Sequence, residues 1–416
     1  MAAVPRRHPI RLVLREDDLR RRRWTVLGRL LLAIPHLVWL AAWGLAVSVA
    51  AVALWLVLLV EGRAPAILHE FVAAYLRYST HVGAYVLLAA ERYPGFRGAP
   101  GYVVDLEIDP PRRQRRWSVL ARLVLALPAL ALSSALGGGL TLGGGRGVAA
   151  VAAFLAFFAA LVLGRVPRDL RDLIAYALGY AAQTIGYLLL LTDRYPSSDP
   201  ALLLPTAELP THPVRVVVTD ELERSRLTVF FRILLAIPHA VWLALWTTVV
   251  LVSTAAAWVT ALAAGRVPSL LHRFGVAYVR YSTHVSAFVT LVGRRFPGFV
   301  GRAGSYEIDV TIDPPTRVRR LGILARPLLA LPALLLAGAL SGVLLVVALL
   351  GWWYALVAGR EPKGLRNLGA ACLRYGTQTS AYLLLLADRY PDAAPVLPRT
   401  NAPESQALPL PRRDAF

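Results

Sequence analysis

The stretch LLAIPHLVWL at residues 31–40 places a proline and a histidine inside a long apolar run, and LLAIPHAVWL at residues 234–243 repeats it in the second half of the chain. Proline removes a helical hydrogen bond and disfavours helical geometry in the residue before it. We therefore expect a bend at Pro35, with an interfacial amphipathic helix over 24–34 and a membrane span over 36–59. The recurrence predicts that the whole unit is repeated.

The composition indicates a membrane protein. Of the 416 residues, 57% are hydrophobic and 17% are charged, whereas a soluble domain has about 25% charged residues. Residues 37–60 and 328–357 contain no charged residue, and each run exceeds the roughly 20 apolar residues that cross a bilayer. The arginines behind the net charge of +20 flank these runs, as is usual at the ends of spans. We therefore expect a lipid bilayer, and no nucleic acid, as the partner.

Three landmarks recur four times along the chain. An arginine stands six residues before a proline in the pairs Arg29–Pro35, Arg122–Pro128, Arg232–Pro238 and Arg326–Pro332. A Gly-Arg-x-Pro turn follows at 62–65, 164–167, 265–268 and 359–362, and an Arg-Tyr-Pro or Arg-Phe-Pro sequence closes each unit at 92–94, 194–196, 295–297 and 389–391. This spacing predicts four two-helix hairpins joined at the Gly-Arg-x-Pro turns. We expect repeats at 1–98, 99–200, 201–301 and 302–395, followed by a disordered tail at 396–416.

The second helix of each hairpin is less apolar than the first. In the first repeat its polar residues recur at spacings of three, four and seven, which places them in one stripe of a helix. Such a helix can cross a membrane when the stripe faces other helices, or it can lie flat at the interface. We favour spanning, which predicts a mainly α, polytopic membrane protein of four parallel hairpins and about eight transmembrane helices.

The distribution of arginines predicts an orientation. The N-terminal segment and the connector before the second repeat are rich in arginine, whereas the first hairpin tip offers only Arg63. By the positive-inside rule, both termini and the connectors should be cytoplasmic and the tips outside. Lys363 is the only lysine, and such a preference for arginine suggests a GC-rich bacterial genome. We therefore expect a bacterial inner (plasma) membrane protein.

A short alternating segment precedes each hairpin: PIRLVLR, YVVDLEID, PVRVVVT and YEIDVTID. Alternation with a period of two predicts half-buried strands. The outward face is basic or neutral in the first and third segments, as at Arg11 and Arg215, and acidic in the other two, as at Asp105, Glu107 and Asp309. Because opposite charges favour strand pairing, we expect strands of unlike repeats to pair in a small cytoplasmic sheet. Four separate extended linkers are the alternative.

The motifs IPHLVWL, GRAP, LRYSTHVGAYVLL and ERYPGF resemble a bacterial membrane family, common in actinobacteria, that is labelled domain of unknown function four-three-eight-nine. All four repeats resemble its pattern. The second departs most, with Gly179 in place of the mid-helix arginine and the insert GGGLTLGGGRG at 137–147. The resemblance implies a strand, a span, a turn and a second helix in each repeat, and it implies no known activity.

Polar residues within the apolar helices are the candidate functional positions. The histidines form repeat-equivalent pairs: His8/His212, His36/His239, His69/His272 and His81/His284. Histidine suits proton relay or metal binding, but duplication copies an inherited residue whether it is useful or not. Arg77 and its equivalents lie near the middle of second helices, where a charge either binds an anion or donates to backbone carbonyls. The candidate functional or structural positions are His36, Arg77, His81, His239, Arg280, His284 and Arg374.

The position of His36 carries the most specific expectation. Because the two helices of a hairpin are neighbours, His36 should approach the lower half of the second helix, near His81 or Tyr85 and within one turn of the stretch 78–89. We expect it to hydrogen-bond the carbonyls that Pro35 leaves free. The sequence contains one cysteine, Cys372, and neither HExxH nor CxxC. We therefore predict no catalytic, cofactor or metal site.

The sequence as a whole predicts a multi-pass integral membrane protein that is not an enzyme. We expect a scaffold, an assembly partner of an unknown membrane protein, or a lipid-organising module, with anionic lipid headgroups at the arginine clusters. The alternative is a transporter or channel with parallel pseudo-symmetric halves. A polar cavity lined by Arg77, Arg280 and the histidine pairs would favour transport, whereas a core sealed by aromatic and leucine side chains would favour the scaffold.

Overall fold

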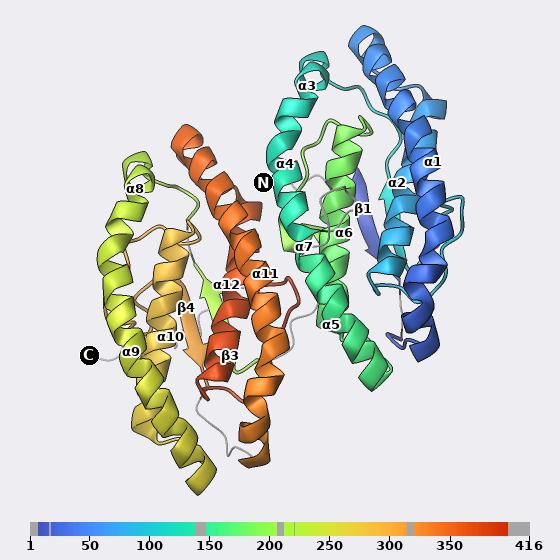
Figure 1. Cartoon of the computed structure of the whole chain (residues 1–416). Helices are drawn as coiled ribbons and strands as arrows, with labels where there is room; N and C mark the ends of the chain where they lie inside the picture. The colour runs from blue at the N-terminus through green and yellow to red at the C-terminus, as the bar shows by residue number, and fades with distance from the viewer. Residues whose placement is uncertain are drawn as a thin grey trace, which may run out of the picture.

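The computed structural model describes residues 7–15, 18–137, 147–205, 212–219, 221–313 and 320–397. These residues are mainly helical and form three layers (Figure 1). The outer layer contains α1 (Arg23–Glu61), α3 (Arg116–Leu120), α4 (Arg122–Leu136), α5 (Val148–Leu163), α8 (Arg226–Phe230), α9 (Arg232–Ala264) and α11 (Arg320–Ala358). The middle layer contains α2 (Ala66–Val86), α6 (Arg168–Leu188), α10 (Ser269–Val289) and α12 (Lys363–Leu383), with the short α7 (Pro200–Leu203) beside α6 and α12. The third layer consists of β1 (Ile10–Leu14), β2 (Val104–Ile108), β3 (Val214–Val218) and β4 (Ile308–Ile312), which pack on the middle helices.

The Gly-Arg-x-Pro turn joins an outer helix to a middle helix in all four repeats. Gly62 has a φ of 72° and its amide bonds the carbonyl of Leu58, so it ends α1 in the left-handed conformation that glycine adopts without strain. Pro65 then stands immediately before α2, where its fixed φ and missing N–H do no harm. The predicted two-helix hairpin is confirmed.

The outer helix is not interrupted where the sequence predicts. Helix α1 continues through Pro35 as one helix of 39 residues, and α9 likewise continues through Pro238. In the second and third repeats the interruption falls earlier, at Ala121 and Phe231. The separate interfacial helix over 24–34 is therefore wrong. Side chains on both sides of the proline, such as Ala33 and His36, are buried, and this packing stabilises the helix across the lost hydrogen bond.

Strands of unlike repeats pair, as predicted. Strand β1 pairs antiparallel with β2, and β3 with β4. Arg11 stands opposite Glu107 in the register, and its guanidinium lies 3.3 Å from that carboxylate. The same preference joins Arg215 to Asp313 at 2.9 Å. The expected small sheet is two separate two-stranded ribbons (β1–β2 and β3–β4), each of which joins the strands of two neighbouring repeats.

Neighbouring repeats run antiparallel, which corrects the expected parallel arrangement. The amide of Arg21, just before α1, donates to the carbonyl of Gly164 in the tip of the second repeat over 2.9 Å. The amide of Gln114, just before α3, donates in the same way to Gly62 in the first tip. Arg224 and Gly359 form the equivalent contact in the second half. Connectors and tips therefore lie at the same ends, so a membrane cannot separate all connectors from all tips.

Three helical stretches are long and apolar enough to cross a membrane within the described part of the chain: 23–61, 232–264 and 322–358. Helices α4 and α5 have 15 and 16 residues, and the middle helices are not among the three. The expected eight spans are therefore not confirmed. Most of the Gly-rich insert, residues 138–146, and the tail from 398 onward lie outside the described residues.

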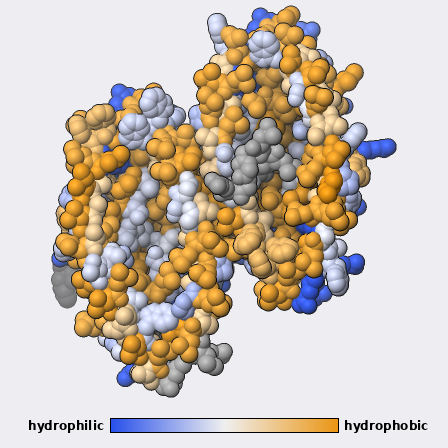
Figure 2. All heavy atoms as spheres, in the orientation of Figure 1, coloured by the Kyte–Doolittle hydropathy of each residue, from blue (hydrophilic) through white to orange (hydrophobic). Residues whose placement is uncertain are grey.

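The large exposed apolar side chains gather on the outer layer. Leu30, Leu45, Val60 and many others along α1 are exposed, and α9 and α11 show the same pattern. Figure 2 views this layer and shows an extensive apolar surface. On α1 the buried residues recur at spacings of three, four and seven, so one face packs on the middle layer while most of the helix circumference faces outward.

Candidate functional site: polar groups between the layers

His36 and His239 lie between the outer and middle layers. The Nδ1 atom of His36 is 2.6 Å from the hydroxyl of Tyr78, and the ring stacks on Phe96 with centroids 4.4 Å apart. His239 repeats this geometry with Tyr281 at 2.7 Å. The predicted approach to the stretch 78–89 is confirmed at its first residue, Tyr78, whereas His81 and Tyr85, the predicted neighbours, bond Asp105 and pack on Tyr93. The predicted partner is wrong, because His36 bonds a tyrosine hydroxyl and not the carbonyls near Pro35. Its Nε2 atom is buried without a hydrogen-bond partner among the described residues.

Arg77 and His81 fasten strand β2 to the middle helix α2. Arg77 donates through Nε to the carbonyl of Leu106 at 3.1 Å and through Nη1 to that of Gly98 at 3.3 Å. His81 Nε2 lies 2.9 Å from the carboxylate of Asp105. These groups come from residues that are far apart in the sequence, and together they hold the ribbon across the middle of α2. The arrangement matches the structural alternative for Arg77, donation to backbone carbonyls.

Asp105 is the acceptor at the centre of this cluster. Its carboxylate also accepts hydrogen bonds from the amides of Gly101 at 2.6 Å and Leu106 at 2.8 Å. Burial alone would raise the pKa of Asp105, but the hydrogen bonds from His81 and from the two amides favour the ionised form and hold this pKa below its usual value. Asp105 is therefore a carboxylate that the fold stabilises in its charged form.

The third repeat carries a looser copy of the cluster. Arg280 donates to the carbonyls of Val310 at 3.0 Å and Gly301 at 3.3 Å. His284 Nε2 is 3.8 Å from Asp309, which is too long for a hydrogen bond. The arginine contacts are thus kept in both copies, while the histidine–aspartate contact is close only in the first.

Glutamine replaces the histidine in the second and fourth repeats, and glycine replaces the arginine in the second repeat alone. Gln183 donates to the carbonyl of Ile10 at 2.9 Å, and Gln378 donates to that of Val214 at 3.1 Å, so both hold the partner strand. Arg374 is buried and donates to the carbonyls of Asp392 and Ala394. A Cβ at Gly179 would approach the Leu12 side chain to 3.3 Å, so this departure from the repeat pattern lets β1 lie close against α6.

A second set of arginines joins the start of each outer helix to the end of its middle helix. The sequence showed their constant spacing from a proline but not which groups they bind. Arg29 donates to the carbonyls of Tyr85 at 2.6 Å and Ala90 at 2.9 Å, and its guanidinium lies 4.4 Å from the centre of the Tyr85 ring. The residue between them, Leu88, has a φ of 65°. The equivalent arginine, aromatic and positive-φ leucine are Arg122, Tyr187 and Leu190; Arg232, Phe288 and Leu291; and Arg326, Tyr382 and Leu385. We refer to these four sets as the arginine clamps. The fourfold recurrence of the arginine and the aromatic residue was the signal that they meet.

The described residues contain no group of three or more histidine, cysteine, aspartate and glutamate side chains that could hold a metal ion. His8 and His212 bond their own strands through Nδ1, at Ile10 and Val214. A surface pocket of about 490 Å³ lies beside the first cluster, lined by His81, Arg92 and Arg97 among others. Near these candidate positions the observed polar contacts join helices, strands and loops to one another.

A family model described as a domain of unknown function (DUF4389) matches residues 23–97, 116–198, 226–300 and 320–393. The chain belongs to this family. Each DUF4389 match runs from the outer helix through the middle helix to the loop after it, while β1 precedes the first match and the other three strands lie between matches. Searches of curated proteins and of solved structures found no significant match.

Proposed function

We propose that this protein is a monotopic membrane protein and not a multi-pass one. In this proposal the outer helical layer lies in the plane of one leaflet, and the two ribbons face water. The protein would act as a non-enzymatic scaffold that organises lipids. Interfacial helices of this kind bury an apolar face at the boundary between headgroups and acyl chains.

The position of the β1–β2 ribbon carries the proposal. Arg77, at the middle of α2, bonds strand β2, and the same part of α2 packs through Tyr75 on Trp43, at the middle of α1. If α1 stood upright in the bilayer, the ribbon would lie at mid-membrane depth. The side chains of Arg11 and Glu107 on the ribbon are 33% and 61% exposed, and a charge at that depth costs about 2.5–3.5 kcal/mol on insertion scales. Lying in the plane of the leaflet avoids this cost.

The lengths of the outer helices support the same orientation. Helix α1 has 39 residues, about 58 Å at 1.5 Å per residue, which is nearly twice the roughly 30 Å hydrocarbon core. The equivalent segment of the second repeat is divided into α4 and α5, of 15 and 16 residues. Each is shorter than the roughly 20 residues of a span. A helix that lies in the plane of the leaflet does not have to match the bilayer thickness, so this orientation fits both the long and the short outer helices.

The ends of the outer layer carry the residues typical of a membrane interface. Trp24 and Trp117 are 86% and 82% exposed near the starts of two outer segments, and tryptophan concentrates at such interfaces. Exposed arginines accompany them at both ends: Arg22, Arg23, Arg63, Arg115, Arg116, Arg165, Arg226, Arg266 and Arg360. Cations at this depth attract anionic headgroups. The partner would therefore be a leaflet containing anionic lipids.

The scaffold fits the polar contacts better than the transporter does. A transporter would need a polar cavity lined by Arg77, Arg280 and the histidines. Both arginines instead donate to carbonyls of the loops and strands, and His36 is enclosed by aromatic rings. These contacts favour a rigid layer over a conduit.

Labelling from one side of the membrane tests the orientation. Single cysteines would be introduced as Arg63→Cys, Arg165→Cys and Glu107→Cys in a Cys372→Ser background. An impermeant maleimide would be added to intact spheroplasts and to inside-out vesicles. All three positions should react in the same preparation, whereas Val49→Cys on the outer layer should be protected in both. Reaction of positions 63 and 165 from opposite sides would overturn the in-plane orientation.

A further inference from the structure

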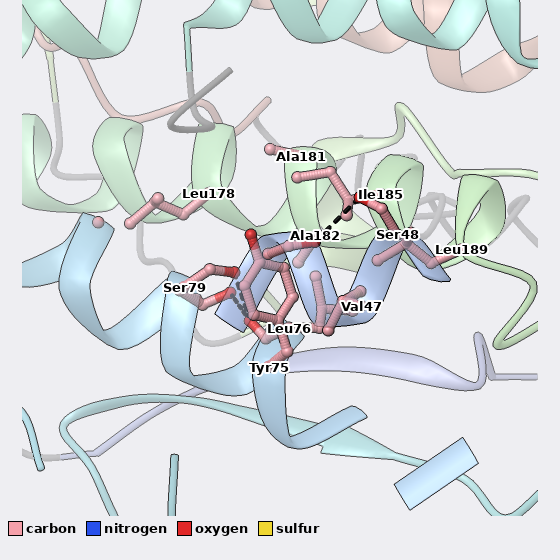
Figure 3. A pocket seen from close by; sticks show the side chains of 13 residues that line it. Val47, Ser48, Tyr75, Leu76, Ser79, Leu178, Ala181, Ala182, Ile185 and Leu189 are labelled. Atoms are coloured by element: carbon pink, nitrogen blue, oxygen red, sulfur yellow. Dashed lines mark hydrogen bonds between the residues drawn. The ribbon is translucent and has the colours of Figure 1, made fainter. Parts of the chain in front are cut away.

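A pocket of about 230 Å³ lies where α1, α2 and α6 meet (Figure 3). Helix α1 contributes Gly44, Val47 and Ser48, and the remaining lining residues come from α2, α6 and Leu189 at the end of α6. Apolar side chains such as Leu178 and Ile185 form much of the wall. The hydroxyl-bearing side chains of Tyr75, Ser79 and Thr80 lie along α2. A fourth hydroxyl, that of Ser48 on α1, donates to the carbonyl of Gly44. The pocket therefore combines an apolar wall with hydroxyl groups on α1 and α2.

The pocket lies on the outer-layer side of the middle helices. None of its lining residues belongs to the strands that cover the opposite side of α2 and α6. Helix α1 is tied to the rest of the outer layer near its two ends, where Arg23 donates to the carbonyl of Val162 and Arg116 to that of Val60. Gly44 and Ser48 lie between these ties. The pocket is thus a recess in the apolar surface that we propose enters the membrane.

Small residues keep this recess open, and the other half of the chain carries larger residues at the same positions. Thr247 stands where the first repeat has Gly44, and its hydroxyl is 2.9 Å from that of Tyr278. Thr377 stands where the second repeat has Ala182, and it bonds Thr283 at 2.9 Å.

In the first half, a Cβ at Gly44 would lie 3.0 Å from the hydroxyl of Tyr75. This hydroxyl therefore lacks the threonine partner that its equivalent, Tyr278, has in the third repeat. It lies among the lining residues, so a ligand in the pocket can reach it.

We propose that the pocket binds the ester end of one acyl chain of a bilayer lipid, with the Tyr75 hydroxyl donating to the ester carbonyl. This proposal rests on the monotopic orientation, because that orientation places the junction of the two layers at the headgroup–acyl boundary. The volume is below the roughly 300–1,000 Å³ of typical small-molecule sites. It therefore suits part of a lipid whose remainder stays in the leaflet. Val47, Leu178 and Ile185 would contact the first methylenes.

Photo-crosslinking tests this assignment. The full chain would be reconstituted in vesicles of phosphatidylcholine and phosphatidylglycerol that contain one of two probes: a phosphatidylcholine with a diazirine near the ester of one acyl chain, or one with a diazirine farther along that chain. After illumination, mass spectrometry would locate the adducts. The probe near the ester should give adducts at Tyr75 and Ser79 in the pocket, and the deeper probe should give adducts at exposed positions such as Val49 and Leu56 of the outer layer.

Residues taken from the other half of the chain supply a matched variant. Gly44→Thr with Ala182→Thr installs the side chains found at the equivalent positions of the third and fourth repeats, where the same fold accommodates them. The pocket adducts should fall severalfold while those at Val49 and Leu56 remain. The reverse variant, Thr247→Gly with Thr377→Ala, should gain adducts at Tyr278.

The outcomes separate the pocket from the membrane orientation. Pocket adducts that persist unchanged in the filled variant, or that are absent from the wild type while Val49 is labelled, would overturn the pocket assignment alone. Absence of adducts at Val49 and Leu56 would overturn the proposed orientation, and the pocket proposal would fail with it.

Discussion

The backbone amide of Arg21 donates a hydrogen bond to the carbonyl oxygen of Gly164 over 2.9 Å. Arg21 immediately precedes the first outer helix, and Gly164 ends the second repeat's outer helix. The start of one repeat and the tip of the next are therefore neighbours. This contact makes the two repeats of each half antiparallel, and it places one connector and one tip at each end of the layer.

Cross-linking at this junction should succeed. Arg20 and Arg165 form an isolated antiparallel bridge, and directly opposed residues in such a bridge have Cα atoms about 4.5–5.5 Å apart, within the range of a disulfide. We expect Arg20→Cys with Arg165→Cys, in a Cys372→Ser background, to form a disulfide on mild oxidation. Electrophoretic mobility and peptide mapping would detect it.

A matched pair provides the control for that experiment. Arg20→Cys with Arg63→Cys places the two thiols at opposite ends of α1, so it should not cross-link within one molecule. Glu223→Cys with Arg360→Cys should cross-link, since these residues form the equivalent bridge in the second half. Failure of 20 to cross-link with 165, together with cross-linking of the two tips in an Arg63→Cys with Arg165→Cys variant, would favour parallel hairpins.

The contact between His36 and Tyr78 should stabilise the hairpin. Tyr78→Phe leaves a buried imidazole nitrogen without its partner, which costs about 1–3 kcal/mol. Replacing both residues, as His36→Phe with Tyr78→Phe, should recover part of this loss because no polar group is then left unpaired. Chemical unfolding of the protein in mild detergent would measure the free energies.

Tyr75→Phe is the control on the same helix. Its hydroxyl has no threonine partner at Gly44, so this change should alter the free energy of unfolding by within about 0.5 kcal/mol. Equal losses for Tyr75→Phe and Tyr78→Phe would show that the hydrogen bond to His36 contributes nothing specific.

Asp105 should make the stability of the ribbon depend on acidity. The folded-state pKa of this carboxyl is lowered, so the stability it contributes is fully present above the unfolded-state pKa of about 3.9. That stability is lost as the pH falls through the folded-state pKa. Thermal unfolding between pH 3 and pH 7, values chosen to bracket an aspartate titration, should show a gap between wild type and Asp105→Asn that closes only below about pH 4. A gap that stayed constant down to pH 3 would contradict this role.

Strand pairing was predictable because two independent features of the sequence indicate it. One is the alternation of apolar residues, and the other is the opposite charge of residues such as Arg11 and Glu107. The antiparallel order of the repeats was not predictable in this way. Its junctions are backbone hydrogen bonds, as between Arg21 and Gly164, and backbone groups leave no mark in a residue pattern. Counting arginines also misled, because exposed arginines occur at both ends of the outer layer.

For the candidate residues too, the sequence predicted the approximate position but not the partner. His36 was predicted near 78–89 because hairpin geometry requires it, but its partner is the hydroxyl of Tyr78, which the rise per residue alone does not select. Asp105 was read as a surface charge on a strand. Its burial against His81 depends on where the ribbon crosses α2, and that is a tertiary relationship.

The arginine clamp of the first repeat should tolerate lysine poorly. Arg29 donates to two carbonyls and to Glu91 while stacking on Tyr85, and an ammonium cannot reproduce this planar fork. We expect Arg29→Lys to lower the free energy of unfolding by about 1–3 kcal/mol. Arg22→Lys, at an exposed position, should change it by within about 0.5 kcal/mol. Equal effects of the two substitutions in chemical unfolding would show that the clamp works through charge alone.

The arginines at the hairpin tips should select anionic lipids. Arg63 and Arg165 are exposed at opposite ends of the outer layer, and each basic residue near an anionic surface contributes about 1 kcal/mol. Lipids that copurify in mild detergent, measured by mass spectrometry, should be enriched in phosphatidylglycerol for the wild type. Arg63→Gln with Arg165→Gln should reduce this enrichment, and so should raised salt, which screens exposed charges.

Arg15→Gln with Arg215→Gln removes the same charge from the ribbons, which the proposed orientation turns toward water, and should leave the enrichment unchanged. If the ribbon variant lost anionic lipid as strongly as the tip variant, the face assigned to the membrane would be wrong.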